Sequence, residues 1–133
     1  MRKINEAYLS ILKIELNDLY EDIEVLIEQC TQERESGRIT NYVFMENLAL
    51  FKNELLGVDA FEKIVRGTDP AAYGSLDEML DHLKACFNDK IRSSGFPEVI
   101  RIYIERKLEK VRQYVTIDEL QMQPAGNKNV TKV

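Results

Sequence analysis

The sequence has few of the residues that catalytic and metal sites require. It contains a single histidine, His82, and two cysteines, Cys30 and Cys86, which form no CxxC or zinc-type pair. The motifs Gly-x-Ser-x-Gly, His-Glu-x-x-His and Gly-x-Gly-x-x-Gly do not occur. We therefore expect a protein without enzymatic activity, cofactor or metal, whose two thiols are reduced and buried.

Long apolar runs are also lacking. No run of about 18 apolar residues exists, so we expect no membrane-spanning helix. The start of the chain has no apolar block typical of a signal peptide, because charge returns at Glu6. These two features predict a cytoplasmic protein.

No segment alternates apolar and polar residues over the length of a strand, and no repeat of about 20 to 50 residues is visible. The chain of 133 residues is 44% hydrophobic and 31% charged, which suits one soluble core. We expect an all-α fold, an antiparallel helical bundle of four main helices with one or two short ones. Residues 1–120 would form one domain, followed by a flexible C-terminal tail, residues 121–133.

The first predicted helix, Ile4 to Cys30, is long and carries an uninterrupted apolar seam. The seam recurs at intervals of three and four residues and comprises Leu9, Leu12, Leu16, Leu19, Ile23, Leu26 and Cys30. Gly37 would stop this helix after a polar stretch. A helix of about 30 residues would extend roughly 45 Å, more than a compact monomer of this size needs to cover it.

Helix boundaries follow from capping residues. Thr40 or Asn41 would start the second helix, and Gly57 would end or bend it before a short third helix, residues 60–66. Pro70 suits a brief helical turn, and Ser75 with Glu78 has the spacing of a capping box. Gly95, after two serines, would break the helix that follows Ser75, and the last helix would begin at Pro97. The core side of the last helix would be formed by Ile100, Ile104, Leu108, Val111 and Val115.

A second seam lies roughly opposite the first on the N-terminal half of the first helix. It comprises Ile4, Ala7, Ile11 and Ile14, with Tyr8 beside them. A stripe that its own bundle leaves uncovered usually marks a partner surface, so we expect these five residues to bind a second copy or another protein. The alternative is a buried layer within one chain.

Charge is unevenly distributed along the chain. Residues 1–36 hold nine acidic and four basic residues, which equals the whole net charge of −5, whereas residues 97–112 carry a net charge of +2. The two helices should attract each other. Glu15, Asp18 and Asp22 could bind a cation or perform acid–base chemistry, but we expect a solvated or ion-paired flank whose partner is the last helix.

A stripe of aromatic and basic residues on the last helix is the only candidate nucleic-acid surface. It comprises Tyr103, Arg106, Lys107, Lys110 and Tyr114. Such interleaving suits phosphates and stacked bases. The chain is acidic overall, however, so we favour a second interpretation in which the lysine stems pack on the core and their heads face the first helix.

A histidine and two further potential ligands recur along one predicted helix as Glu78, His82 and Cys86. Residues eight apart are about 12 Å distant along a helix, so the three cannot close on one ion. We expect His82 to be a solvated surface residue.

The favoured hypothesis is a homodimeric adaptor, regulatory or assembly factor that acts through protein–protein interaction. A nucleic-acid-binding regulator is the first alternative. An enzyme or metal-binding protein with an unrecognised pocket between helices is the second.

Overall fold

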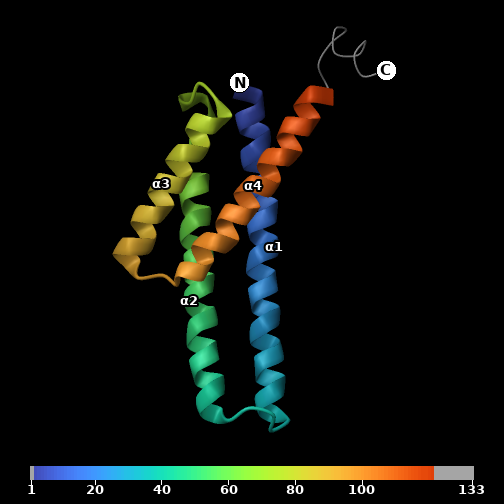
Figure 1. Ribbon diagram of the computed structural model, residues 1–133, viewed down its shortest axis with the longest axis vertical. Helices are drawn as coiled ribbons and strands as arrows, with labels where there is room; N and C mark the ends of the chain where they lie inside the picture. Colours follow the sequence, from blue (N-terminus) through green and yellow to red (C-terminus); the bar gives the residue numbers. More distant parts are fainter. Residues whose placement is uncertain (1, 122–133) are drawn as a thin grey trace.

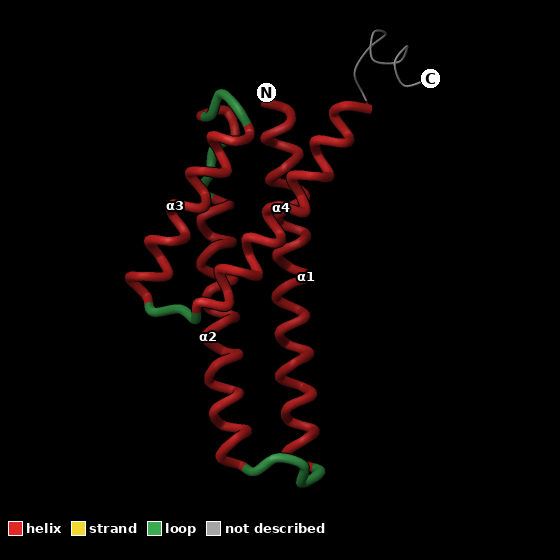
Figure 2. Tube along the Cα trace, viewed as in Figure 1, coloured by secondary structure: helices red, strands yellow, loops and turns green. Residues whose placement is uncertain are grey.

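The computed structural model describes residues 2–121 and confirms the all-α bundle (Figure 1). Its elements are α1 (Arg2–Glu35), α2 (Asn41–Arg66), the 3-10 turn η1 (Pro70–Ala72), α3 (Leu76–Ser94) and α4 (Glu98–Gln121). Over the described range every element is helical and no strand occurs (Figure 2). The predicted tail, apart from its first residue, lies outside the described residues.

Most predicted helix boundaries are confirmed. Gly37 ends the first helical segment with a φ of 79°, and Gly95 closes α3 in the left-handed conformation with a φ of 69°. The Thr40 hydroxyl accepts a 3.1 Å hydrogen bond from the Val43 amide at the start of α2. The Ser75 hydroxyl plays the same role at the start of α3.

The predicted break at Gly57 is wrong, because α2 runs without interruption through the segment 60–66. A Cβ atom at Gly57 would lie 3.2 Å from the side chain of Ile100, so this glycine allows α4 to approach α2 closely. Within this uninterrupted helix, Asp59 pairs with Lys63 one turn later, at 3.4 Å.

The four helices build two unequal parts. α1 and α2 form a long antiparallel hairpin, and α3 and α4 pack only against the half remote from its loop (Figures 1 and 2). We call the four-helix part the body and the protruding residues 24–53 the arm. Within the arm only Cys30 and Phe44 are buried, so its two helices are covered mainly by each other.

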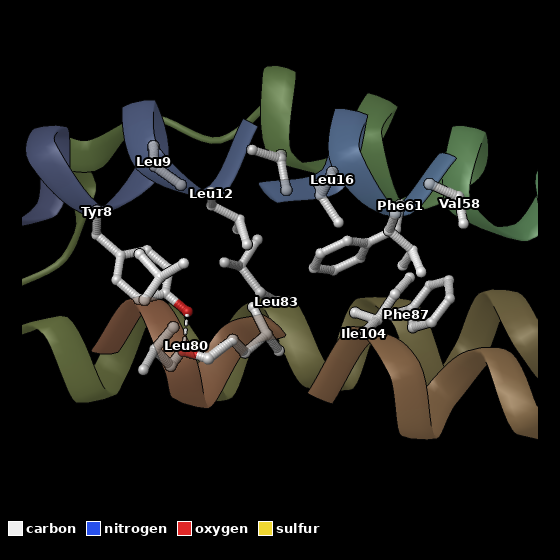
Figure 3. Close-up of a cluster of buried hydrophobic side chains, with 14 of the residues drawn as sticks. Tyr8, Leu9, Leu12, Leu16, Val58, Phe61, Leu80, Leu83, Phe87 and Ile104 are labelled. Carbon is white, nitrogen blue, oxygen red and sulfur yellow. Dashed lines mark hydrogen bonds between the residues drawn. The ribbon is translucent and has the colours of Figure 1, made fainter. Parts of the chain in front are cut away.

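One hydrophobic core fills the body and receives side chains from all four helices (Figure 3). Phe61 of α2 and Phe87 of α3 meet at its centre, with ring centroids 4.9 Å apart. The predicted first seam is buried in this core as far as Ile23. Leu26 of the same seam remains 38% exposed, because it lies in the arm beyond α4.

Candidate functional site: an open helical arm

Tyr8 of the predicted partner stripe lies inside the body. It is fully buried, and its hydroxyl donates a 2.8 Å hydrogen bond to the backbone carbonyl of Leu108 on α4 (Figure 3). Burial, more than the nearby charge of Glu109, raises the pKa of this hydroxyl far above its usual range. Tyr8 is therefore a neutral hydrogen-bond donor that joins the first helix to the last and offers no surface to a partner.

The other four residues of the stripe lie at the edge of the body. Ile4 and Ile11 are half-buried and pack against the core, whereas Ala7 and Ile14 face solvent. Ile14 is 62% exposed. The chain thus covers part of the predicted partner surface itself and leaves Ala7 and Ile14 open.

Glu15 lies at the centre of an ion cluster between α1 and α4. Its Oε1 accepts hydrogen bonds from Lys107 Nζ at 2.8 Å and from Lys110 Nζ at 3.1 Å. The hydrogen bond from Lys107 is the main cause that holds the pKa of the Glu15 carboxyl below its usual value. The predicted attraction between the acidic first helix and the basic last helix is thus present as specific contacts.

The aromatic and basic stripe of α4 is partly used by these same contacts. Lys107 and Lys110 are bound to Glu15, which matches the interpretation that their heads face the first helix. Arg106 and Tyr114 are exposed and Tyr103 is half-buried. A nucleic acid would therefore have to compete with Glu15 for two of the five residues.

His82 and Cys86 form a pair on α3, with 3.3 Å between Nε2 and Sγ. The His82 ring also lies 5.4 Å from the ring of Tyr73. Glu78 does not join them, because its carboxylate accepts a hydrogen bond from the Gly74 amide at 2.9 Å. Among the described residues no group of three or more histidine, cysteine or acidic side chains could hold a metal ion.

Two of the clefts in the body lie against α2. One, of about 310 Å³, lies between α1 and α2 beside Lys13, Tyr20 and Glu62. The other, of about 550 Å³, lies between α2, the end of α3 and Phe96, with Lys63 among its lining residues. Neither cleft is lined by a histidine or a cysteine. Neither therefore contains a cysteine or histidine nucleophile or base.

The arm carries several large apolar side chains that are exposed to solvent. Six of the eleven large apolar side chains that are exposed in the described part of the chain belong to it: Val25, Leu26, Tyr42, Val43, Met45 and Leu50. Burying such side chains is favourable at about 25 cal/mol per Å², so an exposed cluster favours association. The periodicity of the sequence did not predict this concentration of exposed apolar side chains on the arm.

A sequence signal for this surface exists in the first half of α2. Residues 41–56 contain only three charged residues, and the inward seam of Phe44, Leu48, Phe51 and Leu55 leaves other apolar residues to face outward. Within the arm these outward residues include Tyr42, Met45 and Ala49. A helix with apolar residues on more than one face needs more than one neighbour.

One side of the arm continues the surface on which α4 lies. On α1, Tyr8 and Glu15 contact α4, and Leu26 follows Tyr8 by about five full turns and so points the same way. On α2, Leu50 and Val43 precede Gly57, which meets α4, by about two and four turns. We call Leu26, Leu50 and Val43 the open face.

Glu54 lies where the open face meets the body, about one turn from both Leu50 and Gly57. The residue is 3% exposed, and its Oε1 has no hydrogen-bond partner. Burial raises the pKa of its carboxyl above the usual value. A buried carboxyl oxygen without a partner costs stability, so this position is a weak point of the junction between arm and body.

Comparison with known protein families, curated proteins and solved structures finds no match to this chain. None of the described helices is both long and apolar enough to cross a bilayer.

Proposed function

We propose that this protein acts without enzymatic turnover, as an adaptor, regulatory or assembly factor that binds other proteins through its arm. The single observation that carries the proposal is the exposure of apolar side chains on a hairpin that α3 and α4 leave uncovered. Leu50, for example, is 45% exposed although it lies on the side where α4 covers α2 further along. An apolar helix face of this kind gains free energy when a partner excludes water from it.

The body serves in this proposal as the support of the arm. Its core, the Tyr8–Leu108 hydrogen bond and the Glu15 ion cluster fix α4 against α1. The two arm helices continue α1 and α2 without a break, so the body sets their orientation. Recognition surfaces on rigid helices lose little conformational entropy when they bind.

The proposal is tested by affinity purification of the tagged full chain from the cytosol of its source cells. The double variant Leu26→Asp/Leu50→Asp should lose proteins that the wild-type chain retains in fixed stoichiometry. The matched control Leu56→Asp, which also places a charge at an exposed leucine but outside the arm, should retain them. Retention of the same proteins by both variants would contradict the role of the arm.

We also propose that the protein is a homodimer in the cytoplasm, held through the exposed part of the second seam. Ala7 and Ile14 are open to solvent on one side of α1, and the half-buried Ile11 and Ile4 border them. A twofold axis would bring the same residues of two copies together. This surface lies on the body, so a dimer formed there leaves the arm free.

A further inference from the structure

We infer that the open face of the arm binds a basic amphipathic α-helix of a partner protein. This inference rests on the proposed function and specifies the chemistry of the partner. The binding helix would lie over the α1–α2 hairpin beyond the start of α4 and cover Leu26, Leu50 and Val43 with its own apolar side. Helix-in-groove recognition of this kind uses anchor residues one turn apart.

The apolar part of the open face comes from both arm helices at one level. Asn47 Nδ2 of α2 lies 3.7 Å from Cys30 Sγ of α1, which shows which turns of the antiparallel pair face each other. Leu26 and Leu50 are each about one turn nearer the body than this contact. A helix lying across the pair would therefore contact both leucines at once.

The rim of the open face is acidic. On α1, Asp22 and Glu33 lie about one turn before and two turns after Leu26, and both are exposed. On α2, Glu46 lies about one turn before Leu50 and is exposed as well. A partner with lysine or arginine beside its apolar stripe would place positive charge against this rim.

The basic residues on the two helices of the described arm do not lie on the open face. The Arg34 guanidinium carbon lies 4.0 Å from the ring centroid of Phe44, which holds this arginine against the buried seam. Lys52 follows Leu50 by two residues and so points to nearly the opposite side of α2. Arg38 belongs to the loop between the helices. On α1 and α2 themselves, the side that carries the open face therefore presents acidic charge only.

The chain already contains one example of this mode of binding. α4 buries an apolar stripe that includes Ile104 and Leu108, while Lys107 and Lys110 donate hydrogen bonds to Glu15. Asp22 follows Glu15 by about two turns on the same side of α1. The surface of the hairpin that binds α4 is apolar with an acidic flank. The open face, beyond the start of α4, has the same combination.

A second copy of the arm is a poorer occupant of the open face. The arm carries five acidic and three basic residues, and its rim acids would face those of the other copy. Like charges placed opposite each other in an interface oppose association. The same charges favour a basic helix.

The test measures binding of the full chain to labelled synthetic helices by fluorescence anisotropy. One peptide of about 18 residues, roughly 27 Å long, has leucine at heptad positions a and d and lysine at the other positions. The matched peptide has glutamate in place of lysine. We expect the lysine peptide to bind at least about tenfold more tightly, with an affinity that falls as salt is added.

Three variants locate the binding surface. Leu26→Asp/Leu50→Asp should weaken binding of the lysine peptide by about tenfold or more, and Leu56→Asp should leave it unchanged. Asp22→Lys/Glu33→Lys should weaken the lysine peptide and strengthen the glutamate peptide. Circular dichroism establishes that each variant keeps the helicity of the wild type.

Several results would overturn the inference. These are absence of binding, equal affinity for the two peptides, or equal losses in the open-face and control variants. Concentration-dependent dimerisation that Leu26→Asp/Leu50→Asp abolishes would instead identify a second copy as the occupant. If native partners still depend on the arm while the peptides are not distinguished, the inference fails and the proposed function stands.

Discussion

The Tyr8 hydroxyl on α1 and the Leu108 carbonyl on α4 form a buried 2.8 Å hydrogen bond between residues 100 positions apart in the sequence. Near it, Glu15 accepts hydrogen bonds from Lys107 and Lys110. Together these contacts fix the last helix on the first. They lie within the body, and the part of the hairpin beyond the start of α4 is open.

The substitution Tyr8→Phe removes this hydrogen bond and keeps the ring. We expect the free energy of unfolding to fall by about 1 kcal/mol, the usual net value of one buried hydrogen bond. Urea unfolding measures the change. Tyr42→Phe is the matched control, since the Tyr42 hydroxyl donates to Glu46 at the exposed surface and its loss should change stability little. Equal effects of the two substitutions would contradict the buried role of Tyr8.

Glu15 should make the stability of the protein depend on acid pH. Its carboxyl pKa in the folded state is below the ordinary value of 4.5, so the unfolded chain binds the proton more tightly. The stabilisation is complete above about pH 4.5 and is lost as the pH falls toward the lower, folded-state pKa. Urea unfolding at a series of pH values should show this loss in the wild type.

The variant Glu15→Gln removes the charge that the two lysines bind. We expect it to be less stable than the wild type at pH 7 by about 1–3 kcal/mol, the range for hydrogen bonds to charged groups. The difference between the two proteins should shrink below pH 4.5. Glu21→Gln, at an exposed site of the same helix, serves as the control. A difference from the wild type that stays constant from pH 7 to 3 would contradict the ion cluster.

Glu54 should change the pH dependence of stability in the opposite direction to Glu15. Its pKa in the folded state is above the ordinary value, so ionisation of the carboxyl opposes folding at neutral pH. Glu54→Leu should raise the free energy of unfolding at pH 7.5 by about 1–3 kcal/mol, because a buried group without a partner is removed. Below the folded-state pKa the wild type should recover part of this difference. A variant that is less stable at pH 7.5 would show that Glu54 has a partner after all.

Ile14→Asp tests the proposed homodimer. The side chain is 62% exposed, so the substitution should leave the monomer folded and change the solution mass from dimer to monomer. Light scattering measures the mass and circular dichroism the helicity. The same mass for wild type and variant would remove Ile14 from the dimer interface.

Helical periodicity and capping residues were sufficient to predict the fold class and most boundaries. Thr40, Ser75 and Gly95 act locally, through bonds or backbone angles that depend on a few neighbouring residues. The prediction at Gly57 was wrong because the role of this glycine depends on its contact with Ile100. Ile100 belongs to α4 and lies far from Gly57 in the sequence. A contact between residues distant in sequence leaves no local pattern.

The partner surface was harder to predict for the same reason. Ile4, Ala7, Ile11 and Ile14 fit one helical stripe with Tyr8 beside them, but α4 lies close enough to accept the hydrogen bond of Tyr8, which is completely buried. The exposure of Leu26 depends in turn on where α4 begins. Periodicity identifies which apolar side chains could be buried against another helix. The packing of α4 determines which of them are buried.

The most direct test of the central claim, that the arm and not the body receives a basic helix, is amide NMR of the full chain. The lysine-rich helical peptide is added to the labelled protein, and chemical shifts are followed residue by residue. Changes confined to the open face, at Leu26, Val43, Leu50 and their neighbours, are the predicted result. Changes centred on Ile14 or on the exposed side of α4, with the arm unaffected, would contradict the account.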